Sequence, residues 1–240
     1  MSDRVLVISG GTKGLGRELC LEFGRAGYRV IALYSSDTQA ADELGALLVS
    51  RSVQAKIVRC DVRGDLRADP SHAEYAAWLE GSEITVMHNA SRAFEPKPFN
   101  QIELAEFSAH FEVNVLGGCQ LAKAFVPRMI KAKKGTLITV CSSAVEGDAP
   151  KGFSAYLAAK QGLRGLTRAL AAEYGRLGLR ILSVSPGLMD TPLTRAWEPE
   201  LLRMMTASGA SARAPEEIAR KIYSIAVAPG TAGAGENYVL

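Results

Sequence analysis

Short apolar segments alternate with longer segments of helical periodicity along the whole 240-residue chain. The short segments are rich in Val and Ile and apolar at successive positions, which is typical of strands buried on both faces. They cover residues 4–9, 29–34, 54–60, 84–88, 136–141 and 180–185. The helical segments between them cover residues 15–25, 38–51, 71–79, roughly 103–133, 155–175 and 215–227.

This alternation predicts right-handed βαβ units, and therefore a doubly wound, Rossmann-type α/β fold with helices on both faces of a parallel sheet. A chain of this length commonly forms one such domain. Since no repeat, low-complexity tract or linker interrupts the pattern, we expect a single domain over residues 1–240. Residues 187–214, rich in Pro, Thr, Met and Ala, are expected to form an insertion over the edge of the sheet.

Composition narrows the class of protein further. The net charge is only +3, and Lys and Arg occur in short runs broken by apolar residues, which argues against a nucleic-acid partner. The first apolar run stops at glycines after about half a dozen residues, so we expect no signal peptide. No apolar stretch approaches the roughly 18 residues of a membrane span. These features predict a cytoplasmic protein without a membrane partner.

The four cysteines are far apart, and none forms a CxxC pair or a Cys/His cluster with the spacing of metal ligands. Most lie inside apolar segments. We interpret them as buried small hydrophobic residues in a reducing compartment, and expect no metal site.

Small or polar residues follow five of the predicted strands. They are Gly10, Asp61, Asn89, the pair Ser142 and Ser143, and the pair Pro186 and Gly187. Ligands of open parallel sheets bind at the carboxyl ends of the strands. The sequence therefore predicts a binding site at this edge of the sheet.

A glycine-rich turn joins the first strand to the first helix. Its sequence from residue 9 is Ser9, Gly10, Gly11, Thr12, Lys13, Gly14, Leu15 and Gly16. Glycines permit a tight turn and close approach of a pyrophosphate, and the following helix N-terminus offers N–H groups and partial positive charge. Because no Gly-Lys-Ser/Thr sequence closes the turn, a phosphate-binding P-loop is excluded, and a dinucleotide is the expected ligand.

The spacing of these glycines, Gly-x-x-x-Gly-x-Gly, resembles the Thr-Gly-x-x-x-Gly-x-Gly fingerprint of the short-chain dehydrogenase/reductase family, with Ser9 in place of the threonine. This resemblance implies an oxidoreductase that transfers hydride between a nicotinamide cofactor and a carbonyl or alcohol. It assigns cofactor contacts to Gly10, Thr12, Lys13, Gly14, Leu15 and Gly16.

The end of the second strand bears on the choice of cofactor. An enzyme that prefers NAD(H) usually places an acid there to hold the ribose 2′-hydroxyl. Here Tyr34 occupies that place, and Asp37 comes three residues later, where it is better placed to cap the next helix. Lys13 is a cation that could reach a 2′-phosphate, with hydroxyls from Ser35 and Ser36. We therefore expect NADP(H) rather than NAD(H), although Lys13 could instead be a solvated surface lysine.

Tyr156 and Lys160 are predicted to lie one helical turn apart on the same face of a helix. A nearby ammonium lowers the pKa of a phenol by stabilising the phenolate. A tyrosine tuned in this way can act as a general acid toward a developing alkoxide. Alone this spacing is common, and it gains weight from Ser143, thirteen residues upstream at the end of a buried strand.

Asn114, Ser143, Tyr156 and Lys160 are similar to the family's Asn-Ser-Tyr-Lys catalytic set. The resemblance implies that Tyr156 is the general acid and that Lys160 lowers its pKa and holds the nicotinamide ribose. It implies that Ser143 orients the substrate carbonyl and that Asn114 supports a water linking Lys160 to solvent. Ser142 is a neighbouring candidate, but the family's spacing favours Ser143. Asn114 could equally be a satisfied polar group on a buried helix.

Further matches to the family occur in order along the chain. They are Asp61 and Val62 as adenine contacts, Asn89 and Ala90 as the core of the Asn-Asn-Ala-Gly motif, and Pro186, Gly187 and Thr191 as a nicotinamide-contacting loop. His88 and Ser91 replace the outer residues of the Asn-Asn-Ala-Gly motif. A buried structural histidine is the favoured interpretation of His88, with a role in shaping the pocket as the alternative.

The layout is closest to the 3-oxoacyl-thioester reductase branch of the family, which implies a 3-oxoacyl thioester or a related ketone as substrate. Steroid-like, sugar or other cyclic ketones remain as alternatives, and a non-catalytic dinucleotide sensor is a third. Trp197 and the apolar residues after it could cover the substrate as a lid, or form a helix packed on its own core. The resemblance also implies a homo-oligomer, a dimer or tetramer.

One basic segment raises the question of an acidic partner. Four basic residues cluster at the end of the helix predicted before the fifth strand: Arg128, Lys131, Lys133 and Lys134. They could meet an acyl-carrier protein, but a solvated helix end with a favourable dipole interaction is the preferred interpretation.

Overall fold

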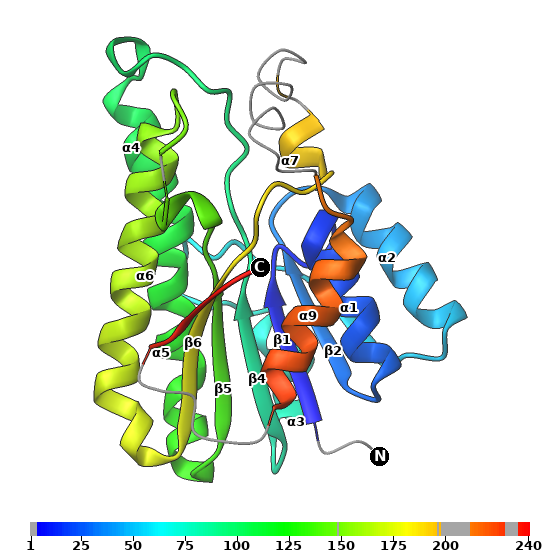
Figure 1. The fold of residues 1–240 in the computed structure, drawn as a ribbon. Helices are drawn as coiled ribbons and strands as arrows, with labels where there is room; N and C mark the ends of the chain where they lie inside the picture. The colour runs from blue at the N-terminus through cyan, green and yellow to red at the C-terminus, as the bar shows by residue number, and fades with distance from the viewer. Residues whose placement is uncertain (1–3, 148, 196, 198–211, 229–234) are drawn as a thin grey trace.

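The computed structural model describes residues 4–147, 149–195, 197, 212–228 and 235–240. They form one seven-stranded parallel sheet in the order β3-β2-β1-β4-β5-β6-β7 (Figure 1). The strands are β1 (Arg4–Ser9), β2 (Arg29–Tyr34), β3 (Ala55–Arg59), β4 (Glu83–His88), β5 (Gly135–Val140), β6 (Leu179–Ser185) and β7 (Asn237–Val239). The strand order reverses between β1 and β4, which places their carboxyl ends at a topological switch point.

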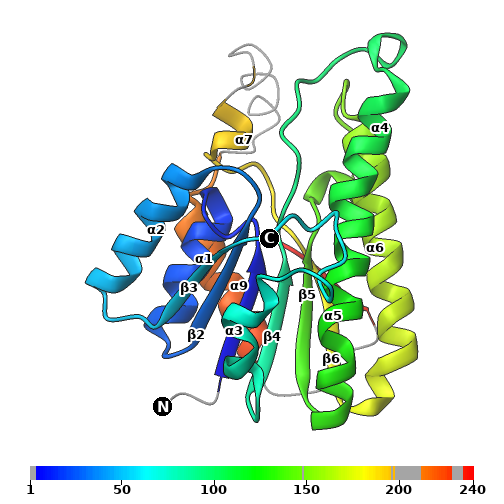
Figure 2. The same ribbon diagram turned by 180° about the vertical axis from the view of Figure 1, so that it is seen from behind.

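Helices cover both faces of the sheet. One face carries α1 (Gly14–Arg25), α2 (Thr38–Ser50) and α9 (Pro215–Val227), and the other carries α3 (His72–Leu79), α5 (Gly117–Ala132) and α6 (Ser154–Tyr174). In both views the group formed by α5 and α6 and the group formed by α1, α2 and α9 stand on opposite sides of the sheet (Figure 1, Figure 2). The expected doubly wound α/β fold is confirmed.

Two apolar layers hold the helices on the sheet because each buried strand presents side chains to both faces. Val5, Val7 and Phe125 belong to the layer under α3, α5 and α6. Leu6 and Ile8 belong to the layer under α1, α2 and α9. The alternating residues of β1 therefore supply both cores.

Local sequence explains where several helices begin. The Asp37 side chain accepts a hydrogen bond from the Ala40 N–H and so caps α2. Pro215 stands in the first turn of α9, where its fixed φ suits a helix and its missing N–H costs nothing. Glu103 and Glu106 form a capping box at the start of α4 (Leu104–Phe111).

The helix predicted over residues 103–133 is interrupted. The π-helical turn η2 (Glu112–Leu116) separates α4 from α5 and contains the buried Asn114. Such turns insert one residue into a helix and occur frequently at functional sites. The side-chain periodicity continues through η2 with only a small offset, so the sequence pattern did not reveal it.

The remaining elements are short. They are the 3₁₀ turns η1 (Phe99–Gln101), η3 (Ser143–Val145) and η4 (Gly175–Leu177), and the helix α7 (Pro192–Arg195). Strand β7 was not predicted from the sequence; it pairs with β6 at the sheet edge. The expected insertion over residues 187–214 is described only in part, because residues 196 and 198–211 lie outside the described residues. None of the helices described is long and apolar enough to cross a membrane.

Candidate functional site

A cavity of about 740 Å³ opens at the carboxyl ends of the strands. All of the cofactor residues expected from the sequence line it except Gly16, and of the four expected catalytic residues only Asn114 does not. The lining residues from this set are Gly10, Thr12, Lys13, Gly14, Leu15, Ser35, Ser36, Asp61, Val62, Asn89, Ala90, Ser143, Tyr156, Lys160, Pro186, Gly187 and Thr191. Residues from six strand exits thus meet at one site, as the parallel topology requires.

The glycine turn forms one wall of this cavity. Gly10 and Gly14 have φ angles of +62° and +49°, values that side-chain-bearing residues rarely adopt. Gly16 instead fills a packing position, because a Cβ atom there would lie 2.0 Å from the carbonyl oxygen of Gly10. Within the described chain, the N-cap residue of α1 makes no side-chain capping bond. The N–H groups of the first turn of α1 therefore remain available to an anion in the cavity.

Lys13 forms an ion pair with Asp37 at the end of the cavity beside β2. The Ala40 N–H, and secondarily Lys13, hold the pKa of Asp37 below its ordinary value. Both side chains are substantially exposed, so the pair contributes little to stability. The ion pair bears on cofactor binding, because Asp37 already balances the charge of Lys13, which is expected to meet a 2′-phosphate.

Tyr156 and Lys160 project from the first half of α6 and are almost fully buried, at 8% and 2% exposure. The Lys160 Nζ donates a hydrogen bond of 2.8 Å to the Val140 carbonyl and lies 5.7 Å from the centre of the Tyr156 ring. Burial lowers the pKa of Lys160 to about 8. Burial raises the pKa of Tyr156 to about 12, opposed by a hydrogen bond from Ser142. The expected lowering of the Tyr156 pKa by Lys160 is therefore not found in this structure, where desolvation is the largest influence.

Ser142 and Ser143 both line the cavity just after β5, but they face different partners. The Ser142 hydroxyl caps η3 by accepting a hydrogen bond from the Ala144 N–H at 3.3 Å. Its hydrogen bond with Tyr156 opposes the rise in the pKa of that tyrosine. The Ser143 N–H donates to the Pro186 carbonyl at 2.9 Å, and its hydroxyl lies toward Gly187. The structure thus brings both candidate serines to the site, with Ser142 nearer the tyrosine and Ser143 nearer the loop after β6.

Asn114 lies behind the cavity wall and is fully buried. Its Nδ2 donates to the His110 carbonyl at 2.9 Å, and its own carbonyl lies 2.9 Å from the His88 Nε2. The Asn114 Oδ1 has no hydrogen-bond partner among the described residues. A buried, unpaired amide oxygen is a suitable place for an ordered water.

An aromatic cluster beside Tyr156 was not found from the sequence. Phe94 stacks on the Tyr156 ring at 4.7 Å with an interplanar angle of 18°, and meets Phe153 and Trp197 edge-on at 5.0 Å and 5.5 Å. The Trp197 indole N–H donates to the Phe94 carbonyl at 2.9 Å and fixes the loop that carries it. Phe94 and Phe153 lie outside the helices and strands, so no periodicity could signal that they meet.

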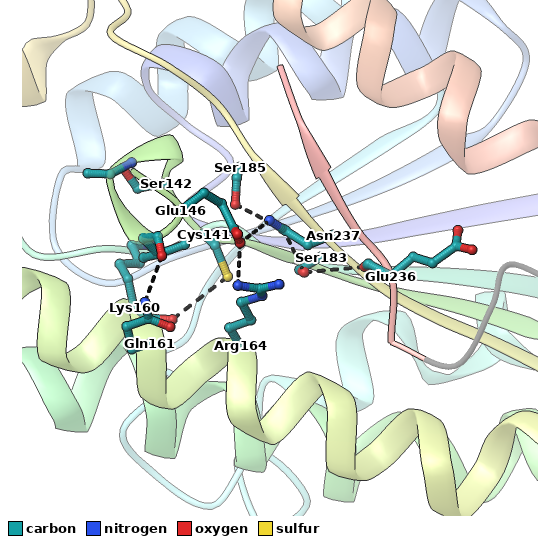
Figure 3. Close-up of polar contacts among 12 residues, drawn as sticks. Cys141, Ser142, Glu146, Lys160, Gln161, Arg164, Ser183, Ser185, Glu236 and Asn237 are labelled. Carbon is teal, nitrogen blue, oxygen red and sulfur yellow. Dashed lines mark hydrogen bonds and ion pairs between the residues drawn. The ribbon is translucent and has the colours of Figure 1, made fainter. Parts of the chain in front are cut away.

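A polar network connects β7 to the turn that follows Ser143 (Figure 3). The Asn237 Oδ1 accepts hydrogen bonds from the Ser183 and Ser185 hydroxyls at 2.8 Å and 2.9 Å, and its Nδ2 donates to the Glu146 carboxylate at 2.8 Å. Glu146 also pairs with Arg164 on α6. These contacts hold the short edge strand in place. They could not be anticipated because β7 itself was not predicted.

His88 is buried in a protein of only three histidines, and it makes a pH-dependent contribution to stability. Burial, with the Lys160 ammonium second, lowers the pKa of His88 to about 4 from an ordinary value of 6.5. The folded state therefore favours the neutral ring. As the pH falls from 6.5 toward 4, His88 is protonated in the unfolded chain but not in the folded protein. The free energy of unfolding is therefore unaffected by this group above pH 6.5 and falls by about 3 kcal/mol by pH 4.

We expect the free energy of unfolding, measured by urea titration at pH 7 and at pH 4.5, to fall less steeply with acid in His88→Gln than in the unsubstituted protein. His110, whose pKa burial also lowers to about 4, and the paired carboxylates add acid sensitivity to both proteins equally. Equal losses of stability in the two proteins would contradict the prediction.

In the part of the chain that the structure describes, no cluster of three or more His, Cys, Asp or Glu side chains could hold a metal ion. The described cysteines are free, and three of the four are buried.

Comparison with known proteins identifies the family of the chain. The sequence model of the short chain dehydrogenase family matches residues 4–201, which is most of the chain. The protein therefore belongs to the short-chain dehydrogenase family of oxidoreductases, whose members bind NAD(P).

Relatives of known sequence and structure span most of the chain. Oxidoreductase UcpA of Salmonella typhimurium is 30% identical over 82% of this chain and 73% of its own length. The 3-oxoacyl-[acyl-carrier-protein] reductase FabG of Pseudomonas aeruginosa is 30% identical over 81% of this chain and 77% of its own. A candidate NAD(P)-dependent gluconate 5-dehydrogenase from Beutenbergia cavernae, solved with NADP, is 25% identical and superposes with a TM-score of 0.86 over 100% of this chain and 95% of its own.

Proposed function

We propose that the protein is an NADP(H)-dependent carbonyl reductase in which Tyr156 is the general acid. The observation that carries the proposal is the placement of Tyr156, Lys160 and the two serines on one wall of a cavity whose other wall is the glycine turn. When bound, the reduced nicotinamide supplies the hydride that adds to the carbonyl carbon. The Tyr156 hydroxyl donates its proton to the carbonyl oxygen, and the product is an alcohol.

The residues present fit a dinucleotide. Glycines occupy the two crowded positions 10 and 16 of the tight turn, and the N-terminus of α1 has N–H groups without a side-chain cap that can bind the pyrophosphate. We assign the adenine end to Asp61 and Val62, and the nicotinamide end to Asn89, Ala90 and the 186–191 loop, in keeping with their positions on the cavity wall.

The remaining roles follow the same placement. Lys160 is a buried cation beside the tyrosine, suited to hold the nicotinamide ribose and to stabilise a developing phenolate. Ser143, with Ser142 beside it, donates a hydrogen bond that orients the substrate carbonyl. Asn114 supports a water at its unpaired Oδ1 and so connects Lys160 to solvent.

The preference for NADP(H) over NAD(H) is supported by the surroundings of Lys13. Tyr34 stands at the end of β2, so this strand offers no acid to hold the ribose 2′-hydroxyl of NAD(H). A 2′-phosphate would replace Asp37 as the partner of Lys13, with Ser35 and Ser36 nearby on the cavity wall. The phosphate and Asp37 therefore compete for one cation.

We expect Lys13→Ala to raise the KM for NADPH by about tenfold, because one charge-assisted contact is lost, and to leave the KM for NADH nearly unchanged. Asp37→Asn is the matched variant. Asparagine still caps α2, but it releases Lys13, so the KM for NADPH should fall. Initial rates with NADPH and with NADH measure these KM values for each variant. A tighter dissociation constant for NADH than for NADPH in the unsubstituted protein would overturn the preference for NADP(H).

For the substrate we propose a 3-oxoacyl thioester or a related ketone, in keeping with the acyl-carrier-protein reductase among the relatives. The aromatic cluster favours a second candidate, a cyclic ketone, because the flat rings of Phe153, Tyr156 and Trp197 offer broad contact to a ring. NADPH oxidation with 3-oxoacyl thioesters, cyclic ketones and sugars as alternative substrates distinguishes these classes. Turnover of a cyclic ketone with failure of every thioester would reject the first candidate.

We also propose a cytoplasmic homo-oligomer, a dimer or tetramer. Large apolar side chains are exposed along the segment that contains η1, α4 and η2. They are Phe99, Leu104, Phe111 and Leu116, and a second copy of the chain would cover them. Sedimentation equilibrium tests this, and a monomer at micromolar concentration would reject it.

A further inference from the structure

The hydrogen bonds around His88 define the protonation state of its ring. The His88 Nε2 lies 2.9 Å from the Asn114 carbonyl oxygen, which can only accept, so Nε2 carries a proton. The Ser9 hydroxyl lies 2.8 Å from the His88 Nδ1 and also accepts the N–H groups of Asn89 and Ala90, each at 3.2 Å. Both lone pairs of that oxygen are therefore occupied. Ser9 must donate its own hydrogen to Nδ1, and the ring is neutral.

The ring occupies a space made for it by two consecutive glycines at the start of α5. A Cβ atom on Gly117 would lie 3.2 Å from the His88 Cε1, and one on Gly118 would lie 3.4 Å from the Cδ2. His88 is only 1% exposed, so the ring cannot turn over without moving the helix. The arrangement of donors and acceptors is thus fixed by packing as well as by hydrogen bonding.

The two hydrogen bonds join separate parts of the cavity wall. Through Ser9 the ring is connected to the exits of β1 and β4, where Asn89 and Ala90 line the cavity. Through the Asn114 carbonyl it is connected to η2, where Val113 lines the same cavity. The π-helical turn interrupts the α-helical hydrogen bonding, and this contact ties its Asn114 carbonyl to the strand exits.

We propose that neutral His88 is a positioning residue that holds the exits of β1 and β4 against η2 and so keeps the cofactor-binding wall in one conformation. This inference rests on the proposed function, because it takes the cavity to bind a nicotinamide cofactor. The imidazole touches neither substrate nor cofactor in this role. It acts through the Ser9 hydroxyl on one side and the Asn114 carbonyl on the other.

Nitrogen-15 NMR of the unsubstituted protein tests the hydrogen-bonding pattern directly. The chain has three histidines, and the variants His72→Gln and His110→Gln identify the signals of the other two rings. We expect His88 to give the shifts of a neutral ring with the proton on Nε2 at pH 7, and to keep them at pH 5.5. A proton on Nδ1, or a charged ring at pH 5.5, would overturn the proposal.

Two variants test the functional consequence. His88→Leu removes both hydrogen bonds, and we expect the dissociation constant and the KM for NADPH to rise by about tenfold or more, with a smaller fall in kcat. His88→Gln offers an acceptor and a donor in one side chain, and it should restore both constants to within about threefold. Unchanged NADPH binding in folded His88→Leu, or equal impairment of folded His88→Gln, would overturn the inference.

The controls separate this inference from the proposed function. If the unsubstituted protein binds no NADPH by fluorescence titration, the proposed function fails, whatever the variants do. If it binds and oxidises NADPH normally, and either folded His88→Leu behaves like it or folded His88→Gln is as impaired as His88→Leu, only the inference fails. Should His88→Leu not fold, a rise of more than about threefold in the NADPH constants of folded His88→Gln, or an NMR signal of a proton on Nδ1, would still overturn the inference.

Discussion

Replacement of Tyr156 by Phe is expected to lower kcat for carbonyl reduction by about a thousandfold while the dissociation constant for NADPH stays within about twofold. The phenyl ring retains the stacking on Phe94 at 4.7 Å and the contacts with Phe153, so the wall of the cavity keeps its shape. Only the hydroxyl that donates a proton to the carbonyl oxygen is removed.

The matched control is Tyr75→Phe, which removes a buried hydroxyl from α3, in the core on the far side of the sheet from α1. It should cost some stability without changing kcat. Initial rates of NADPH oxidation and fluorescence titration measure the two constants for each protein. A Tyr156→Phe protein that keeps most of its activity would show that another group supplies the proton. Nucleotide binding with no turnover even in the unsubstituted protein would instead favour a dinucleotide sensor.

The sequence was sufficient to predict six of the seven strands to within one or two residues, because buried parallel strands have a nearly continuous apolar pattern. Most of the residues expected at the site also line the cavity. Residues that follow parallel strands must meet at one edge of the sheet, so neither result required knowledge of long-range packing. The glycine turn was recognisable for the same reason, since its constraint is local.

What could not be predicted depends on contacts between distant segments. The three residues of β7 have no apolar pattern, and their position is determined by pairing with β6 and by Asn237. The π-helical turn η2 preserves helical periodicity and is visible only in the backbone. His88 departs visibly from the Asn-Asn-Ala-Gly motif, but its hydrogen-bond partners Ser9 and Asn114 could not be predicted because they lie 79 and 26 residues away in the chain. Burial likewise reversed the expected direction of the Tyr156 pKa, which the spacing to Lys160 alone suggested would fall.

Gly16 gives the second prediction, because packing leaves no room for a side chain at this position. Alanine at this position places a Cβ atom 2.0 Å from the Gly10 carbonyl oxygen and 2.6 Å from the Asn89 Nδ2. Those two atoms are themselves joined by a hydrogen bond of 2.8 Å, so neither can withdraw without breaking it. We expect Gly16→Ala to reduce the free energy of unfolding by about 4 kcal/mol or more, since the backbone at Gly10 has to move to admit the methyl group.

Gly165→Ala is the matched control for this substitution. Gly165 lies inside α6, and a Cβ atom there meets nothing within 4 Å. Alanine should therefore stabilise the protein by about 0.5–1 kcal/mol through its better helix propensity. Urea unfolding measures both variants, and NADPH titration of any Gly16→Ala protein that folds should show weakened binding as the turn opens. Coinciding unfolding curves for Gly16→Ala and the unsubstituted protein, with equal affinity for NADPH, would show that the turn is flexible enough to accept a side chain. The close contact between α1 and β1 would then not be what positions the pyrophosphate wall.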